Sequence, residues 1–215
     1  GSSVVENAFP HVGKRLVVNV DLKGFFPNTK FPLILKVLHH RFHERLSPRA
    51  IRLLAVLCSY GGGLPTGAPT SPAIANQILS SADRSISKAA QHKVVNYTRY
   101  ADDLTLSGDD HAPVKLLPFV EEVIGKLGYE LDPKKTNLFR KGRRQCVTGL
   151  VVNQKPNLAK PLRRRLRAAV HHFVHKRPMQ WHGRPMNLTQ LLGRIGFLAQ
   201  TQPEEATRLR NLLEG

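Results

Sequence analysis

The sequence lacks the features of a membrane protein and of a disulfide-stabilised secreted protein. Its 215 residues include no apolar run near the ~20 residues that a membrane-spanning helix needs, and no signal-peptide pattern. The two cysteines, Cys58 and Cys146, lie far apart without the spacing of a zinc site, which favours a reducing cytoplasm. No internal repeat or low-complexity linker is present. Gly1 to Ser3 resembles an expression scar and is set aside. The remainder predicts one substantial core, with at most a small appendage and no membrane partner.

Acidic residues are scarce and unevenly distributed. The chain has 33 Lys and Arg against 15 Asp and Glu, a net charge of +18 and a pI near 10.6. From Pro133 to Pro203 there is no Asp or Glu, whereas 16 Lys or Arg occur. A solvated charged surface normally mixes both signs. This basic segment therefore indicates a polyanionic partner, most often a nucleic acid.

Apolar patterning predicts a mixed α+β fold. The expected elements are a buried strand at Arg15–Asp21, a helix with Leu33, Ile34, Val37, Leu38 and Phe42 as its apolar stripe, a helix capped by Ser47 and begun by Pro48, a helix from Ser71 past Ile86, a hairpin around residue 102, a helix at Val114–Leu127 ended by Gly128, and a strand at Gln145–Asn153. Strand, helices, hairpin, helix and strand in this order match the ferredoxin-like split βαβ arrangement.

The stretch "NYTRYADDLTLSG" places Asp102 next to Asp103 inside a strand-like sequence. One interpretation is a hairpin turn, which Asp tolerates well. The other is a divalent-cation site, which would relieve the repulsion between the two carboxylates. The ferredoxin-like topology brings the end of the first strand, at Asp21, beside the hairpin at the sheet centre. Three converging carboxylates favour the metal site.

The basic segment is mainly helical. Helices are predicted at Pro161–Lys176, Leu188–Ala199 and Pro203–Leu213, the last with Glu204 and Glu205 near its N-terminus. The first of these helices directs Arg163, Arg164 and Arg167 away from its apolar face. These arginines either bind nucleic-acid phosphates or form a merely solvated basic face.

Four motifs in order over residues 15–153 resemble the palm of reverse transcriptases: "VNVDLKGFFPN", "GLPTGAPTSPAIANQI", "YADD" and the turn "DPKKT". The resemblance implies two Mg²⁺ ions, with Asp21 and Asp102 as the principal ligands and the carbonyl of Leu22 as a further ligand. Asp103 is the weaker candidate, because neighbours in a strand point to opposite faces.

The resemblance also assigns nucleotide contacts. Phe26 matches the aromatic gate that excludes a 2′-hydroxyl, so deoxynucleotides are the expected substrate, whereas Phe25 fits an ordinary core residue. Thr66 replaces the family's usual Gln at the nucleotide, although Gly67 still shapes the loop. Lys135, in preference to its neighbour Lys134, is expected to meet the triphosphate and to protonate the leaving group. A plain surface lysine is the alternative.

Two shorter motifs resemble the hallmarks of retron reverse transcriptases. Asn7, Ala8 and His11 match NAxxH, and Val147, Thr148 and Gly149 match VTG, both of which are expected to contribute to RNA recognition. The resemblance implies a bacterial cytoplasmic enzyme that uses a structured non-coding RNA as template and primer. The expected product is a branched RNA–DNA hybrid made from dNTPs for anti-phage defence, with a separate effector protein.

The same resemblance divides the chain into a palm, residues 1–153, and a basic helical thumb, residues 154–215. The family's fingers residues would precede residue 1, so the chain alone is expected to bind metal and RNA without polymerising efficiently. Two alternatives remain: a group II intron-type or CRISPR-associated reverse transcriptase, which should lack the NAxxH/VTG pair, and an RNA-binding scaffold with a vestigial polymerase site.

Overall fold

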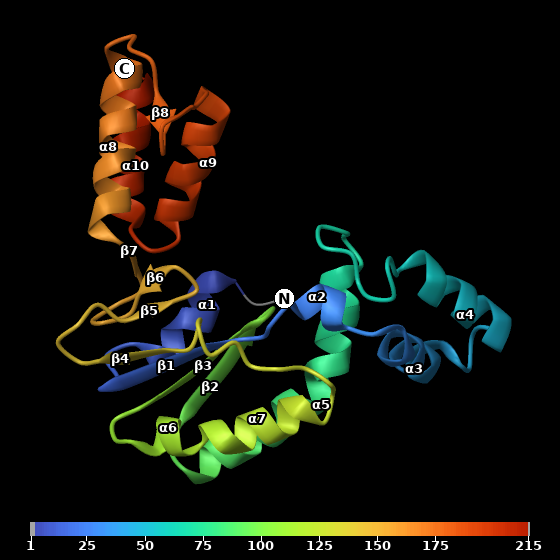
Figure 1. Ribbon diagram of the computed structural model, residues 1–215. Coiled ribbons are helices and arrows are strands. Elements are labelled where there is room, and N and C mark those ends of the chain that lie inside the picture. The colour runs from blue at the N-terminus through green and yellow to red at the C-terminus, as the bar shows by residue number, and fades with distance from the viewer. Residues whose placement is uncertain (1–2, 215) are drawn as a thin grey trace. The chain divides into compact units, whose positions relative to one another are not determined.

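The structure, a computed structural model, describes residues 3–214, so Gly1 and Ser2 of the segment that was set aside lie outside it. The chain forms two compact units. The sheet unit is Lys14–Arg143, and the helical unit combines Gly1–Gly13 with Arg144–Gly215. Figure 1 shows the elements of both units along the chain. The functional division after residue 153 stays a prediction.

A four-stranded antiparallel sheet organises the sheet unit. Its strands are β1 (Leu16–Asp21), β2 (Asn96–Tyr100), β3 (Asp103–Gly108) and β4 (Asn137–Arg140), in the order β2-β3-β1-β4. Both central strands, β1 and β3, pair antiparallel along their whole length, from Leu16 opposite Gly108 to Asp21 opposite Asp103. This is the strand order of a ferredoxin-like sheet, so the predicted α+β split βαβ topology is confirmed.

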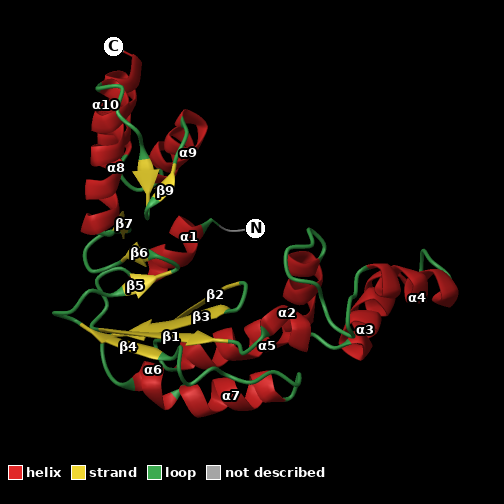
Figure 2. Ribbon diagram, turned by 45° about the horizontal axis from the view of Figure 1, so that its top comes forward, coloured by secondary structure: helices red, strands yellow, loops and turns green. Residues whose placement is uncertain are grey.

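Helices cover one face of this sheet. The helices of the unit are α2 (Phe25–Asn28), α3 (Phe31–Phe42), α4 (Pro48–Leu57), α5 (Ser71–His92), α6 (Ala112–Lys115) and α7 (Leu117–Gly125). Helices α5 and α7 lie along the same side of the sheet (Figures 1 and 2). Their buried residues form one core with Val18, Val20 and Leu104, which point to that face. The predicted cap of α4 is confirmed, since the Ser47 side chain accepts a hydrogen bond from the Ala50 N–H.

Two predicted elements are wrong, a strand and a helix. The fourth strand of the sheet is Asn137–Arg140 rather than Gln145–Asn153. The latter segment forms the short strands β5 (Cys146–Val147) and β6 (Leu150–Val151), because Thr148 and Gly149 adopt positive φ angles and turn the chain. The helix predicted at Val114–Leu127 is broken between α6 and α7, where Pro118 has no N–H to continue the ladder.

The helical unit packs three long helices together. Its elements are α1 (Val4–Ala8), the 3₁₀ turn η1 (Phe9–His11), β5, β6, β7 (Asn157–Leu158), α8 (Lys160–Val174), β8 (Gln180–Trp181), β9 (Arg184–Pro185), α9 (Leu188–Ala199) and α10 (Pro203–Glu214). Leu166, Leu191, Ile195 and Leu209 are almost completely buried between the long helices. The three predicted helices are confirmed with small shifts of their ends. Within residues 3–214, no helix is long and apolar enough to cross a membrane.

Candidate active site and nucleic-acid interface

Two carboxylates face each other at the ends of neighbouring strands. Asp21 ends β1, and its direct partner in the antiparallel pair is Asp103, the first residue of β3. Directly paired residues point to the same face of a sheet, here the face opposite the helices. Asp21 is buried, with 7% of its surface exposed. Like charges directly opposite destabilise a sheet, so this pair costs folding energy that a structural role does not explain.

Asp102 joins this pair from the hairpin turn. Tyr100 pairs with Asp103, which leaves Ala101 and Asp102 as a two-residue turn, and Ala101 adopts a positive φ of 55°. The backbone N–H of Leu22 donates to the Asp102 carbonyl at 3.2 Å and so ties the turn to the end of β1. Asp103 was ranked below Asp102 because strand neighbours alternate. That reason does not apply, since Asp102 lies in a turn.

Two charged groups near Asp21, namely Asp103 and Lys135, have pKa values shifted by their neighbours. Desolvation raises the pKa of Asp103, and the negative charges of Asp102 and Asp21 raise it further. The Lys135 ammonium donates to Asp21 Oδ2 at 2.7 Å, and this bond raises the pKa of Lys135. The Asp132 N–H donates to the Asp21 carbonyl at 2.8 Å, which anchors the turn that carries Lys135. Of the two candidate lysines, the structure therefore directs Lys135 at the carboxylates.

The donor set suits a hard divalent cation. Carboxylate and backbone carbonyl oxygens are the ligands that Mg²⁺ prefers, and a cation would relieve the repulsion that raises the pKa of Asp103. Among residues 3–214, however, no three His, Cys, Asp or Glu side chains are gathered closely enough to form a complete metal site. The described carboxylates thus fit as part of a metal shell, which substrate phosphates and water would complete.

The expected nucleotide-contact residues come from two adjoining segments. Phe25 is buried against Tyr129 at a ring distance of 5.7 Å, which confirms it as a core residue, whereas Phe26 is half-buried. The Leu64 N–H donates to the Phe26 carbonyl at 3.0 Å, so the Pro-Gly loop docks on α2.

Glycine is required in this loop at two positions. A Cβ on Gly63 would lie 2.3 Å from the Pro27 carbonyl oxygen, and Gly67 has a φ of +89°. Thr66, beside Gly67, is exposed. The loop therefore combines a close backbone approach to α2 with an accessible side chain next to a left-handed glycine.

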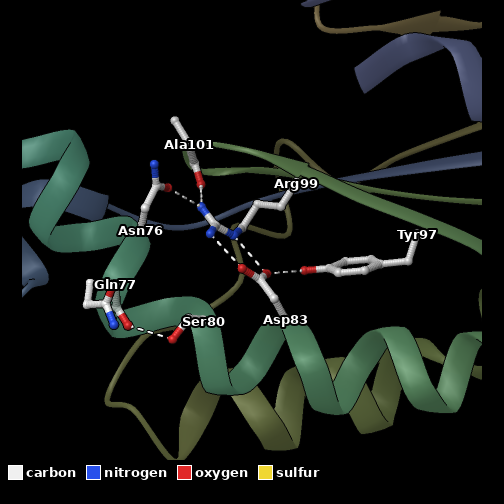
Figure 3. Close-up of polar contacts among 7 residues, drawn as sticks. All are labelled: Asn76, Gln77, Ser80, Asp83, Tyr97, Arg99 and Ala101. Atoms are coloured by element: carbon white, nitrogen blue, oxygen red, sulfur yellow. Dashed lines mark hydrogen bonds and ion pairs between the residues drawn. The ribbon is translucent and has the colours of Figure 1, made fainter. Parts of the chain in front are cut away.

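The residues that hold the hairpin turn were not predicted from the sequence. The Arg99 side chain, only 8% exposed, donates from Nε and Nη2 to both carboxylate oxygens of Asp83 on α5 (Figure 3). Its Nη1 donates to the Ala101 carbonyl at 2.9 Å and to Asn76, and the Tyr97 hydroxyl donates to Asp83. Arg99 thereby links α5 to the turn that carries Asp102. The signal available was a lone Asp within an otherwise uncharged helix face.

The two short motifs of the helical unit meet. The Thr148 hydroxyl donates to the Val4 carbonyl at 3.4 Å, and α1 packs near β6. Asn7, His11 and Val147 are almost fully buried, and burial lowers the pKa of His11 to about 4. Gly149, at a φ of +83°, completes the β5–β6 turn. The geometry makes these residues part of the packing of one unit, and their predicted contribution to RNA recognition would act through that packing.

Two of the three predicted arginines pair with a carboxylate, whereas Arg164 has no ion pair with the acidic residues among positions 3–214. Arg163 donates to Glu205 Oε2 at 2.9 Å, and Arg167 Nε lies 3.7 Å from Glu205 Oε1. Arg164 points outward and is exposed. A cavity of about 640 Å³ lies beside the Glu205 pairs and is also lined by Lys155 and Arg208. Glu205 of α10 therefore partly neutralises the basic surface predicted for α8.

Comparisons with known proteins point in one direction. The model of the family described as reverse transcriptase (RNA-dependent DNA polymerase) matches residues 1–184. The chain is 37% identical over 236 residues to the retron Mx162 reverse transcriptase of Myxococcus xanthus, covering 94% of this chain and 48% of that protein. It is 32% identical over 209 residues to the retron Ec86 reverse transcriptase of Escherichia coli, covering 96% and 62%. The chain thus spans about half to three fifths of the length of these relatives.

Solved structures share the fold at low identity. A foamy viral protease-reverse transcriptase in complex with an RNA/DNA hybrid aligns with a TM-score of 0.59 and 15% identity, over 99% of this chain and 25% of that chain. Apo telomerase from Candida tropicalis aligns with a TM-score of 0.57 and 9% identity, over 97% and 43%. At these identities the likeness is one of fold.

Proposed function

Because the chain belongs to the reverse transcriptase family and resembles its retron type, we propose that it carries the catalytic core of an RNA-directed DNA polymerase. The observation that supports this most directly is the pairing of Asp21 with Asp103, with Asp102 in the adjoining turn. Three acidic residues at one end of the two central strands, on a chain of net charge +18, suit chemistry on a polyanion.

Asp21, Asp102 and the Leu22 carbonyl would hold two Mg²⁺ ions, with Asp103 as a further oxygen donor. When bound, such ions activate the attacking hydroxyl and stabilise the leaving oxygen. The burial of Asp21 and its antiparallel pairing fix the carboxylate before substrate arrives. The Arg99 contacts to Asp83 and Ala101 would hold the turn, and therefore Asp102, in a constant position.

The neighbouring residues would select and orient the nucleotide. Lys135 hydrogen-bonds Asp21, and we propose that it turns to the triphosphate and donates a proton to the pyrophosphate oxygen that leaves. The half-buried ring of Phe26 would lie under the sugar and exclude a 2′-hydroxyl. The exposed Thr66 and the left-handed Gly67 would form the loop beside the base.

The retron branch is supported by the similarity of nearly the whole chain to retron reverse transcriptases and by the meeting of the NAxxH and VTG segments. We infer that the protein binds a structured non-coding RNA, starts DNA from a guanosine 2′-hydroxyl and makes a branched RNA–DNA hybrid from dNTPs. Anti-phage defence with a separate effector, in the cytoplasm of a bacterium, is the biological role that this product implies.

A primer-extension assay tests the proposed activity. The protein is given an RNA template, a DNA primer, Mg²⁺ and dNTPs, and the product is sequenced. The proposal expects template-directed DNA that depends on Mg²⁺, whereas binding of RNA without any extension, also in the longer protein that contains this chain, would favour a scaffold. A parallel reaction with ribonucleotides tests the predicted sugar choice.

A further inference from the structure

The helical unit contains a cavity that the polymerase chemistry does not use. It has a volume of about 440 Å³ and lies where α8, β8 and α9 meet. Its lining includes the apolar and aromatic residues Leu162, Leu166, Phe197 and Trp181, together with Gln190, Gly193 and Arg194. We call it the Trp181 cavity. Its walls are therefore mostly apolar and aromatic, with one cation and no acidic group.

Trp181 and Arg194 form a stacked pair in the cavity wall. The Arg194 Cζ lies 4.1 Å from the centroid of the Trp181 ring, within the range of a cation–π contact. Arg194 Nε is buried and has no hydrogen-bond partner among residues 3–214. A buried donor without an acceptor costs free energy, so the lack of a hydrogen-bond acceptor at Arg194 Nε is unfavourable here. A ligand with flat faces and an acceptor on its edge would stack beside this pair and accept a hydrogen bond from the Arg194 guanidinium.

The surroundings of the cavity are strongly basic. Arg165 on α8 contacts the ring of His182, which follows Trp181, at 2.8 Å, and Arg184 lies two residues further on. The whole segment from Pro133 to Pro203 contains no Asp or Glu. Electrostatic complementarity therefore favours a ligand attached to negative charge over an apolar peptide.

We propose that the Trp181 cavity takes one unstacked nucleobase from a single-stranded nucleic acid, which is RNA in the case of the proposed function. A base has apolar faces that stack on aromatic rings and guanidinium planes, and edge atoms that accept a hydrogen bond from a donor such as the Arg194 guanidinium. The phosphates on either side would lie among Arg165 and Arg184. A duplex does not fit, because its bases remain stacked and paired. The inference rests on the proposed function only for the source of the base.

The chain supplies its own probe, because Trp181 is the only tryptophan among 215 residues. Trp fluorescence is followed while the protein is titrated with single-stranded RNA hexamers, either intact or with one abasic position, and with the matching DNA hexamers. We expect the intact RNA to quench Trp181 and the abasic series to bind about 5- to 150-fold more weakly when the missing base is the one that enters. Equal quenching by RNA and DNA would make the site general for single strands.

Gly193 allows the cavity to be filled without removing Trp181 or Arg194. A Cβ on this helical glycine meets nothing within 4 Å, so Gly193→Leu extends into the cavity and replaces a poor helix former. Gly125→Leu is the matched control, since Gly125 is also helical, meets nothing within 4 Å and lies in the sheet unit. Melting temperatures of both variants are measured first.

The proposal expects Gly193→Leu to keep or raise the melting temperature, to abolish the quench and to bind intact and abasic RNA equally. Gly125→Leu should behave as the wild type in all three respects. If wild-type protein binds both RNAs equally and Trp181 is not quenched, the nucleobase site is wrong even though the protein binds RNA. Absence of any RNA binding would instead contradict the proposed function.

Discussion

The two units of the chain use charge in opposite ways. The sheet unit concentrates carboxylates, with Asp21 buried opposite Asp103, and balances them locally through Lys135. In the helical unit, residues 144–203 contain no Asp or Glu, and the single carboxylate of Glu205 pairs with two arginines of α8, which keeps a net positive charge there. Carboxylates lie together in the sheet unit, where phosphoryl chemistry would need bound cations. They are absent from residues 144–203 of the helical unit, where nucleic-acid phosphates would bind. Each prediction below separates these two roles.

The largest effect is expected from Asp102→Asn in the sheet unit, tested in the longer protein that contains this chain. Loss of one ligand of a two-metal site removes several kcal/mol of transition-state stabilisation, so DNA synthesis should fall by about three orders of magnitude or more. RNA affinity should not change, because the proposed phosphate contacts belong to the helical unit. Primer extension and filter binding measure the two quantities, with Asp110→Asn, at the far end of β3, as the control. A parallel loss of both would break the comparison.

Arg99→Ala should be the most destabilising change in the sheet unit. It leaves Asp83 and Tyr97 without the guanidinium that they share, and breaking such a buried pair costs roughly 3–5 kcal/mol. Urea unfolding measures the loss, and Arg84→Ala, an exposed neighbour of Asp83 on α5, is the control. A double-mutant cycle with Asp83→Ala should show strong coupling. Additive losses in the two single variants would mean that Arg99 and Asp83 do not stabilise the fold through their ion pair.

The helical unit should lose stability in mild acid through His11. Burial lowers the pKa of His11 from 6.5 to about 4 in the folded state, so between these values the unfolded chain binds the extra proton. Stability is therefore complete above pH 6.5 and falls until about pH 4. The total loss in the free energy of unfolding is about 3 kcal/mol, because each unit of pKa difference corresponds to ~1.4 kcal/mol. The free energy of unfolding is measured at several pH values. Its dependence on pH should be weaker in His11→Gln than in the wild type, and unchanged in His40→Gln, a surface control.

Phe26→Ala should relax sugar choice by about 10- to 100-fold without changing template binding. Removal of the ring lets the 2′-hydroxyl enter, which is worth ~1–3 kcal/mol of discrimination. The measurement is kcat/KM for each ribonucleotide relative to its deoxynucleotide. Phe25→Leu serves as a packing control, because Phe25 is buried in the core. An unchanged ratio in Phe26→Ala would place the gate elsewhere.

The smallest effect concerns the basic face of α8. Arg164→Gln should reduce the slope of log K for RNA against log salt by ~0.7–0.9, which is the contribution of about one phosphate contact. Arg163→Gln should flatten it less, because Glu205 already neutralises that side chain. Equal effects of the two variants would mean that the Glu205 pair opens when RNA binds.

The sequence alone was sufficient for the elements that carry local signals. Ser47 and Pro48 mark the start of α4, the Ser71-Pro72 pair starts α5, and the β-branched, aromatic and aliphatic residues around the Asp pair predict β2 and β3. The approach of Asp21 to the hairpin followed from topology, because the central strands of a ferredoxin-like sheet are fixed once the element order is known.

Other features depend on contacts that no local pattern encodes. Strand β4 has four mostly exposed residues, with Leu138 45% exposed, so its apolar signal is weaker than that of the Gln145–Asn153 segment. The Thr148-Gly149 turn requires a non-glycine residue at positive φ, which the valine-rich flanks concealed. The Arg99–Asp83 pair joins residues 16 positions apart, and Arg163 meets Glu205 across 42 positions. Such ion pairs are set by packing, not by propensity.

The central claim is that the carboxylates at the ends of β1 and the β2–β3 hairpin bind divalent cations. Electron paramagnetic resonance of free Mn²⁺ during a titration of the protein with bound RNA template and DNA primer tests it directly. The account predicts that the wild type removes Mn²⁺ from solution, that Asp21→Asn weakens this binding by about 10- to 100-fold or more, and that Asp110→Asn leaves it unchanged. Identical titrations of the wild type and Asp21→Asn would contradict the account.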